Sequence, residues 1–197
     1  MGPCSTKSIE VDTQGIHSIK LARGSEDHTG PDLGLLVLSP LIASSLVAKK
    51  SFVDLDQLQA TILVEPPPIN EGVWVVQGFL QERTQVKRDE LGLLIYFYNF
   101  TGLGTAVPTL DTGEHDYYSF PIDFGEDVPS RFNGMSGGGL WQVRLRKDDQ
   151  SITHRTPLFS GVLFFQEPLE GNEFVIRCHG RQSSYVVAGN YLRNLQP

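Results

Sequence analysis

The alternation of apolar and polar positions divides this chain into short strand-like segments separated by turns. Runs of about 4–8 apolar or alternating residues are typical of strands, and clusters of Gly, Pro, Asn and Asp between them are typical of turns. Before residue 50 the pattern predicts strands over 8–12, 16–22 and 32–38. Beyond residue 70 it predicts six more, over residues 72–81, 93–100, 117–124, 138–146, 157–166 and 173–181. So many short strands favour an all-β protein.

Two helices and a linker complete the pattern. Ser39-Pro40 is a helix-start signal, with Ser39 as the N-cap and Pro40 as the first helical residue of a short helix that runs to about Lys50. Residues 51–70 contain three consecutive prolines and are expected to be a linker with one strand-like piece over 60–64. Ser184 is expected to cap a final amphipathic helix, whose apolar side would consist of Val187, Ala188, Tyr191, Leu192 and Leu195.

These elements divide the chain into three parts. Residues 1–50 are expected to form an N-terminal β part with a short helix, and residues 51–70 a crossing linker. Residues 71–197 are expected to form a complete six-stranded barrel with the C-terminal helix, because closure into a barrel removes exposed strand edges.

Composition and charge exclude several classes of protein. The net charge of -7 argues against a nucleic-acid partner, because phosphate binding needs a basic surface. No apolar run approaches the roughly 20 residues of a membrane-spanning helix, so no membrane association is expected. The only two cysteines, Cys4 and Cys178, imply no disulfide framework and favour a reducing cytoplasm. The cysteines and five histidines lack the short paired spacings of zinc sites, so we expect neither a metal nor another cofactor.

One stretch has the composition of an acyl-transfer site. Ser136 stands among four glycines, at positions 134, 137, 138 and 139, and an apolar strand-like run follows. Glycines allow a tight turn that exposes a serine hydroxyl beside bare backbone N–H groups. The hydroxyl would be the nucleophile, and the amides of Gly134 and Ser136 would face a developing oxyanion. The alternative is a glycine-rich turn in which Ser136 only hydrogen-bonds its own loop.

The spacing Gly134-x-Ser136-x-Gly138 also fits the nucleophile elbow of α/β-hydrolases. That elbow requires a helix directly after the serine. Consecutive glycines followed by the alternating run 140–146 are poor helix formers and predict a strand, so we exclude the elbow.

The run Gly134-Met135-Ser136-Gly137-Gly138 resembles the nucleophile loop of the chymotrypsin/trypsin-like serine proteases, with Gly139 where that family usually has proline. Asp32 opens the run Asp-Leu-Gly-Leu-Leu, which is similar to the strand that begins with the family's triad aspartate. The resemblance to a bacterial-type trypsin-like domain implies a double β-barrel and a peptide or protein substrate. It implies Ser136 and Asp32 as catalytic residues and the amides of Gly134 and Ser136 as the oxyanion hole. Without Ser136 downstream, Asp32 is better explained as a turn residue after Pro31.

The resemblance lacks a histidine. The triad order is His, Asp, Ser, and a histidine about 45 residues before Asp32 would lie upstream of Met1. The first part also has three predicted strands where a family member has six, so its barrel is expected to be incomplete. The five histidines are not expected to act as the base: His17, His28, His115, His154 and His179. We therefore expect a serine endopeptidase that is inactive as this chain, with the histidine upstream, supplied by another chain, or lost.

The resemblance also suggests a specificity pocket. Its floor would lie six residues before the nucleophile, at Ser130, and its walls would include Phe164 and Phe165. A serine floor predicts an apolar residue before the cut, because an unpaired buried cation would be costly. A one-residue slip would place Arg131 at the floor and favour acidic substrates. The competing class is a non-catalytic peptide-binding or scaffold module with a degenerate trypsin-like fold.

Overall fold

The computed structural model describes residues 16–22, 32–48, 50–89, 92–112, 114–123, 129, 131–148, 151–168 and 173–194. Its helical segments are α1 (Pro40–Val47), α2 (Leu55–Leu63), the 3-10 turn η2 (Gln81–Arg83), the π-helical η3 (Gln182–Ala188) and α3 (Gly189–Asn194). Its strands are β1 (Ile16–Ala22), β2 (Leu33–Leu38), β3 (Val73–Phe79), β4 (Gln85–Asp89), β5 (Gly92–Tyr96), β6 (Asn99–Gly104), β7 (Val107–Thr112), β8 (His115–Asp123), β9 (Gly139–Val143), β10 (Leu145–Asp148), β11 (Ser151–His154), β12 (Leu158–Pro168) and β13 (Glu173–His179).

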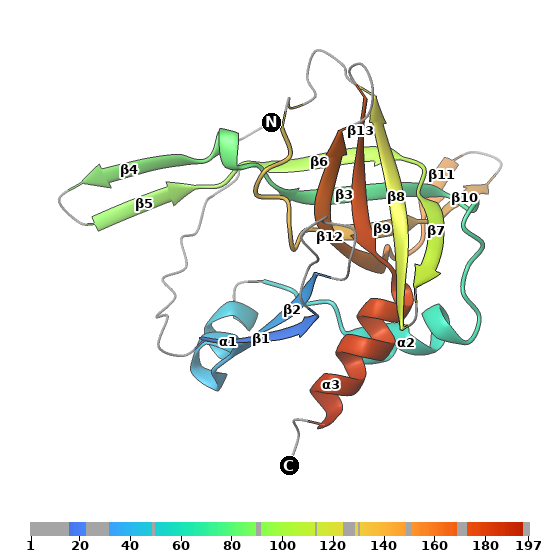
Figure 1. Ribbon diagram of the computed structural model, residues 1–197, viewed down its shortest axis with the longest axis horizontal. Helices are drawn as coiled ribbons and strands as arrows, with labels where there is room; N and C mark the ends of the chain where they lie inside the picture. Colours follow the sequence, from blue (N-terminus) through green and yellow to red (C-terminus); the bar gives the residue numbers. More distant parts are fainter. Residues whose placement is uncertain are drawn as a thin grey trace.

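A seven-stranded antiparallel sheet in the order β6-β3-β9-β12-β13-β8-β7 forms the body of the molecule. Strands β3 and β6 run roughly horizontally in Figure 1, whereas β12, β13 and β8 run roughly vertically. The sheet therefore folds over on itself. The enclosed core is made of one inward-facing residue set: Trp74, Val76, Leu80, Ala106, Tyr118, Phe120, Ile122, Phe132, Met135, Leu140, Leu163, Ile176 and Cys178. The expected mostly β architecture is confirmed, and each of the six strands predicted beyond residue 70 overlaps an observed strand.

The predicted closure into a six-stranded barrel is wrong for the described residues, because none of their sheets closes. The curl brings β6 toward β8, and a Cβ on Gly104 would lie 2.8 Å from the ring of Phe120. Strand β7, which the sequence analysis did not predict, pairs with the edge of β8 that β6 would have to pair with to close the sheet. Pairing with β7 therefore replaces the β6–β8 pairing that would close the sheet.

Three two-stranded antiparallel sheets lie outside this body. Strands β1 and β2 lie where two strands were predicted and pair with each other, whereas the predicted strand over 8–12 lies outside the described residues. The pair β4–β5 forms an arm that extends away from the sheet (Figure 1). The third pair is β10–β11, which follows β9.

Helix α1 confirms the helix-start signal at Ser39-Pro40. The Ser39 hydroxyl accepts a hydrogen bond from the Ile42 amide at 3.4 Å, and Pro40 occupies the first helical turn. The capping oxygen satisfies an amide that has no intrahelical partner. The signal is local, so it fixes the start of the helix irrespective of the rest of the fold.

Residues 51–70 are not the irregular linker that the sequence analysis predicted, because they contain helix α2. The Asp54 carboxylate accepts from the Gln57 amide at 3.1 Å and caps the helix. Leu55, Leu58 and Ile62 recur at helical spacing and pack against Leu158 and Tyr185. The piece over 60–64, predicted as a strand, is therefore the end of α2 and its C-cap.

The C-terminal helical segment exists but begins earlier than predicted. Asp116 in β8 caps it, since its carboxylate oxygens accept from the Gln182 amide at 3.0 Å and the Ser183 amide at 2.8 Å. Ser184 is therefore not the N-cap but a buried residue of η3. The predicted apolar side is only partly right: Ala188 is buried, Tyr191 and Leu192 are 39% and 37% exposed, and Leu195 lies outside the described residues.

A buried polar network fastens the segment after α2 to the sheet. Arg181 donates to Gln142 Oε1, to the Pro67 carbonyl at 3.2 Å and to Ser160 Oγ at 3.4 Å. The Gln142 amide donates in turn to the carbonyls of Pro68 and Glu71 at 2.7 and 2.8 Å. Its buried polar atoms therefore have partners, as a low-dielectric interior requires.

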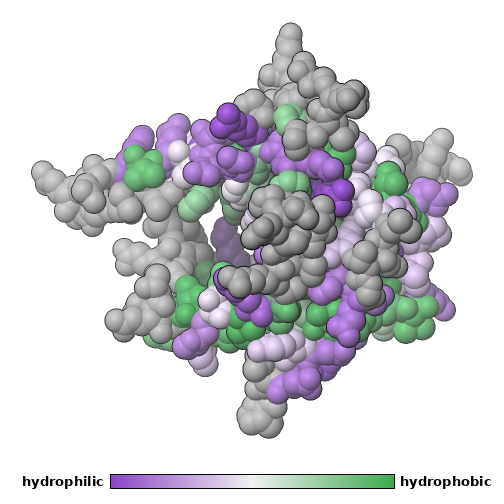
Figure 2. All heavy atoms as spheres, viewed as in Figure 1, coloured by the Kyte–Doolittle hydropathy of each residue, from purple (hydrophilic) through white to green (hydrophobic). Residues whose placement is uncertain are grey.

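Within the described part of the chain, no helix has the length and apolar character needed to cross a membrane. Hydrophobic residues gather in the lower half of the view, around the helical segments (Figure 2).

Candidate functional site

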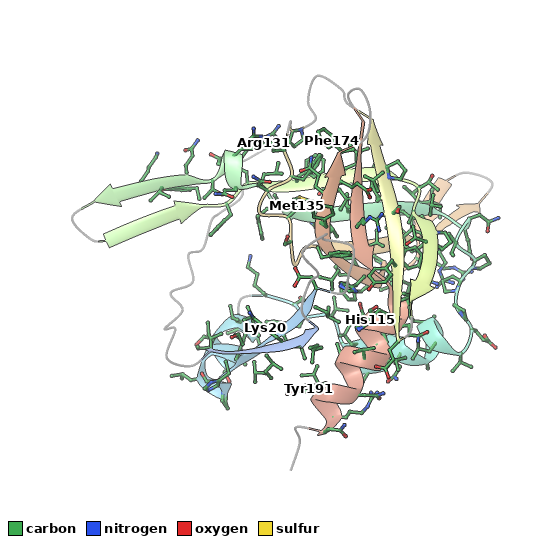
Figure 3. All side chains as sticks on the ribbon, viewed as in Figure 1. Lys20, His115, Arg131, Met135, Phe174 and Tyr191 are labelled. Carbon is green, nitrogen blue, oxygen red and sulfur yellow. The ribbon has the colours of Figure 1, made fainter. Side chains whose placement is uncertain are left out.

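The glycine-rich loop that carries Ser136 lies between β8 and β9 and is anchored by two buried side chains. Phe132 and Met135 both belong to the core of the main sheet, and Met135 Sδ lies 3.1 Å from where a Cβ on Gly78 would stand. Ser136 itself is exposed. The loop, with Arg131 and Met135 labelled, can be followed in Figure 3. Burial of the residues on either side of Gly134 thus holds the serine at the surface in a fixed turn.

Main-chain hydrogen bonds engage three of the loop amides. The Met135 amide donates to the Phe132 carbonyl at 3.1 Å, and the Gly138 amide donates to the Met135 carbonyl at 2.8 Å. The Gly137 amide donates to the Leu163 carbonyl in β12 at 2.8 Å. Among the described residues, no main-chain carbonyl accepts from the other two amides, those of Gly134 and Ser136. These are the two that the sequence analysis named as oxyanion donors.

Two positions in the loop require glycine for different reasons. Gly134 has φ +90°, and a Cβ there would also lie 2.9 Å from the Gln81 nitrogen. Gly138 has no positive φ, but a Cβ there would lie 2.5 Å from the Gln77 carbonyl oxygen. The close packing of this loop on β3 and η2 therefore depends on both glycines.

The Ser136 hydroxyl donates to the Phe164 carbonyl oxygen at 3.2 Å. The acceptor belongs to β12, so Ser136 does not hydrogen-bond its own loop as the alternative expected, although the bond does give the serine a structural partner. It orients Oγ toward β12 and leaves the exposed side of the oxygen open to a ligand. The arrangement fits both a resting nucleophile and a structural hydroxyl.

A cavity of about 200 Å³ opens beside Ser136. The loop contributes one wall, β12 the second, and Ile176 of β13 part of the third; the lining residues are Phe132, Asn133, Met135, Ser136, Leu163, Phe164, Phe165, Gln166 and Ile176. None of them is charged. Gln166 Oε1 accepts from the Phe132 amide at 2.9 Å, so this polar side chain also fixes the loop. The cavity suits a small uncharged group.

The predicted pocket residues have different outcomes. Phe164 and Phe165 line the cavity, as the predicted walls would. Arg131, the alternative floor, is exposed and does not line the cavity. Ser130 lies outside the described residues.

Asp32 stands at the start of β2, with its side chain exposed. Its amide nitrogen and its carbonyl oxygen both lie 3.1 Å from His179 Nε2. The His179 ring packs on Phe164, with ring centroids 4.6 Å apart, and the Phe164 carbonyl accepts from Ser136. Asp32 and Ser136 are thus joined by contacts through two intervening residues, His179 and Phe164.

His179 is fully buried among aromatic rings, with centroids 5.2 Å from Tyr117 and 5.7 Å from His115. Burial, reinforced by the charge of His115, lowers the pKa of His179 from 6.5 to about 4, and the Asp32 main-chain hydrogen bond opposes the shift. The ring is therefore neutral at neutral pH. The tautomer decides whether Nε2 accepts from the Asp32 amide or donates to its carbonyl.

No described histidine hydrogen-bonds Ser136. His17 is exposed in β1, opposite Val37. His115 is half-buried at the start of β8, near the C-terminal helical segment (Figure 3), and His28 lies outside the described residues. For His154, the structure describes only the main chain in β11. A general base for Ser136 is thus not provided by the histidines whose side chains are described.

Two residues that shape the site were missed by the sequence analysis. Gln166 sits at the end of an apolar strand run, and nothing in its spacing distinguishes it from a surface residue. His179 was set aside because it follows the serine in the chain. Its only signal was a histidine at the end of a strand run that alternates apolar and charged residues, next to Cys178. Cys178 itself is a buried free thiol whose pKa is raised by burial.

Among the side chains that the structure describes, no group of three or more His, Cys, Asp or Glu residues could hold a metal ion. No protein-family model, curated protein or solved structure matches the chain. Its function is therefore argued from the geometry of the site.

Proposed function

We propose that the chain is the nucleophile-bearing part of a trypsin-like serine endopeptidase. Ser136 is the nucleophile, the amides of Gly134 and Ser136 bind the oxyanion, and Asp32 orients an imidazole that takes the serine proton. The cavity beside Ser136 holds the side chain that precedes the cleaved bond. In this proposal the curled main sheet corresponds to the second barrel of the family and the β1–β2 pair to part of the first.

The observation that carries the proposal is a pair of main-chain amides, next to the exposed Ser136, that donate to no main-chain carbonyl of the described residues. Three neighbouring amides, those of Met135, Gly137 and Gly138, donate to main-chain carbonyls, while those of Gly134 and Ser136 donate to none of the carbonyls that the structure describes. Gly134 and Ser136 are exposed central residues of two consecutive β-turns, so their amides face solvent and an oxyanion can take the place of water there. Each donor of an oxyanion hole lowers the barrier by about 3–4 kcal/mol.

The mechanism requires an imidazole that the described histidines do not supply. We place its source in an upstream segment or a partner chain that completes the first barrel next to Asp32. In the catalytic step, the Ser136 oxygen bonds the substrate carbonyl carbon while its proton moves to the imidazole. The proton then passes to the leaving amine, and water later repeats the sequence to release the acyl group. A cytoplasmic location remains part of the proposal.

The second candidate is a non-catalytic module that binds peptides through the same cavity. The bond from Ser136 Oγ to the Phe164 carbonyl favours it, because it gives the serine a structural role. The two functions differ in whether Ser136 reacts. Binding alone needs the cavity, whereas catalysis also needs a serine that an imidazole can activate.

A fluorophosphonate probe with and without added imidazole separates the two. Alone, the chain should label far more slowly than an intact serine protease, because loss of the triad base costs about 10⁶ in turnover. Added imidazole should accelerate labelling, and mass spectrometry should locate the label on Ser136.

The matched controls are S136A and S51A, since Ser51 is also an exposed serine. Only S136A should abolish the imidazole-dependent label. Labelling that is equal in both variants, or spread over several serines, would favour the binding module. Rapid labelling without imidazole would instead show that the chain carries its own base.

A further inference from the structure

A second cavity, of about 430 Å³, lies between three segments that are far apart in the sequence. Strand β2 contributes Val37, helix α2 contributes Leu55, and the C-terminal helical segment contributes Leu192 and Arg193. The volume falls within the roughly 300–1,000 Å³ of small-molecule sites. It shares no lining residue with the cavity beside Ser136, so a function for it is independent of the proposed peptidase.

Part of the cavity lining is apolar. Val37 and Leu55 are half-buried, and the side chain of Tyr185 is buried with its hydroxyl donating to the Phe159 carbonyl at 2.7 Å. The tyrosine therefore offers the cavity its ring and not its hydroxyl. Together with Leu192 these side chains form a surface suited to a hydrocarbon body.

Ser184 supplies a second, independent observation. This cavity-lining residue is 4% exposed, and its hydroxyl is buried with no hydrogen-bond partner among the described residues. An unpaired buried hydroxyl is costly unless a ligand or water satisfies it. Ser184 also lies in the π-helical η3, a geometry frequent at functional sites.

The cavity lining also carries two opposite charges, the Arg193 guanidinium and the Asp56 carboxylate. Arg193 donates to Gln59 Oε1 at 3.0 Å and to Asn190 Oδ1 at 2.8 Å, which holds its guanidinium in place. Its only described ionic partner, Asp56, is 3.6 Å away with a side chain that is 86% exposed. Such an ion pair contributes little in water, so a ligand anion can replace it.

We propose that this cavity binds a small organic acid. The hydrocarbon body lies against Val37, Leu55 and Leu192, and the carboxylate accepts hydrogen bonds from the Arg193 guanidinium. Planar guanidinium groups bind carboxylates through paired hydrogen bonds, which accounts for an arginine at this rim.

Calorimetric titration with decanoate, below its micelle concentration, tests this site. Decanoate should bind the full chain with one site, and decan-1-ol, which has the same body without the charge, should bind about tenfold more weakly. R193Q should bind decanoate about tenfold more weakly than the unmodified chain does, and should bind decan-1-ol with unchanged affinity. R155Q, which removes an exposed arginine outside the cavity, should bind decanoate like the unmodified chain.

A variant whose larger side chain fills the cavity provides a second test. Gly189 lines the cavity with a helical φ of -64°, and the side-chain atoms nearest to a Cβ there are those of the Arg193 guanidinium, at an unstrained 3.6–3.8 Å. G189L should fold, raise the melting temperature through its better helix propensity, and abolish binding of both compounds. Unchanged decanoate affinity in G189L or in R193Q would overturn the proposal. So would the absence of decanoate binding to the unmodified chain, or equal affinity for decanoate and decan-1-ol.

Discussion

His179 Nε2 lies 3.1 Å from both the amide nitrogen and the carbonyl oxygen of Asp32, across a sequence separation of 147 residues. This contact fastens the N-terminal β1–β2 pair to β13 of the main sheet. Because the ring of His179 also packs on Phe164, the same contact fixes Asp32 relative to the strand that accepts from Ser136. His179 therefore acts in the proposed site as a positioning residue, although it is not the base.

The pKa of His179 makes the stability of the fold depend on pH. The pKa of His179 is about 4 in the folded protein, below the ordinary value of 6.5. The contribution of neutral, buried His179 to the free energy of unfolding is therefore complete above pH 6.5 and is lost as the pH falls toward 4. The loss should amount to about 3 kcal/mol in the free energy of unfolding. Urea titrations across this range should show a flatter pH profile for H179Q. H17Q, which removes an exposed histidine, should keep the original profile; a profile unchanged in H179Q would refute this role.

Gly134 and Gly137 should differ in their tolerance of alanine. Both have a positive φ, but a Cβ on Gly134 would lie 2.9 Å from the Gln81 nitrogen, whereas nothing lies within 4 Å of one on Gly137. G137A should lower the free energy of unfolding by about 1–2 kcal/mol through backbone strain alone, and G134A by more. Denaturant midpoints of the two variants provide the comparison. Equal midpoints would mean that the loop does not pack on η2 as described.

Arg181 should be among the costliest side chains to remove. Its guanidinium is buried, stacks over Trp74 with a 5.5 Å separation from the ring centroid, and donates to Gln142, Pro67 and Ser160. R181M leaves those acceptors buried without a donor, so it should lower the free energy of unfolding by about 3–5 kcal/mol. R131M, which removes an exposed arginine, provides the control and should change it by less than about 0.5 kcal/mol. A small effect of R181M would show that water replaces the guanidinium.

The uncharged cavity beside Ser136 predicts selectivity among peptide boronic acids, which add reversibly to an active-site serine. An analogue with a phenylalanine side chain next to boron should bind more tightly than one with lysine, because a buried lysine would find no carboxylate. Q166E keeps the oxygen that accepts from the Phe132 amide and adds a charge to the wall. It should shift the preference toward lysine by about tenfold. Tighter binding of the lysine analogue to the unmodified chain would contradict the assignment of this cavity.

Local signals explain what the sequence predicted well. The cap at Ser39 and the strand runs beyond residue 70 depend on neighbours in the chain, and both are found in the structure. The resemblance at Gly134–Gly138 likewise named the two loop amides that no main-chain carbonyl of the described residues engages. These features need no knowledge of the remaining fold.

Long-range contacts explain what it missed. The pairing of β7 with β8 decides against closure of the sheet, and a strand's partner cannot be deduced from its own periodicity. Asp116 caps a helix 66 residues later in the chain, and His179 anchors a strand that precedes it by 147. Helix α2 was missed for a different reason: three following prolines suggested a linker, although the cap at Asp54 and the apolar spacing after it were visible.

A crystal structure of the chain grown with added imidazole, which supplies the missing base, and with a peptide boronic acid that carries phenylalanine next to boron tests the central claim most directly. The account predicts tetrahedral boron bonded to Ser136 Oγ, with the Ser136–Phe164 hydrogen bond broken. One boron-bound oxygen should lie about 2.7–3.1 Å from the amide nitrogens of Gly134 and Ser136, and the aromatic ring should occupy the cavity between the loop and β12. Trigonal boron without a bond to Ser136, or a boron-bound oxygen turned away from both amides, would contradict it.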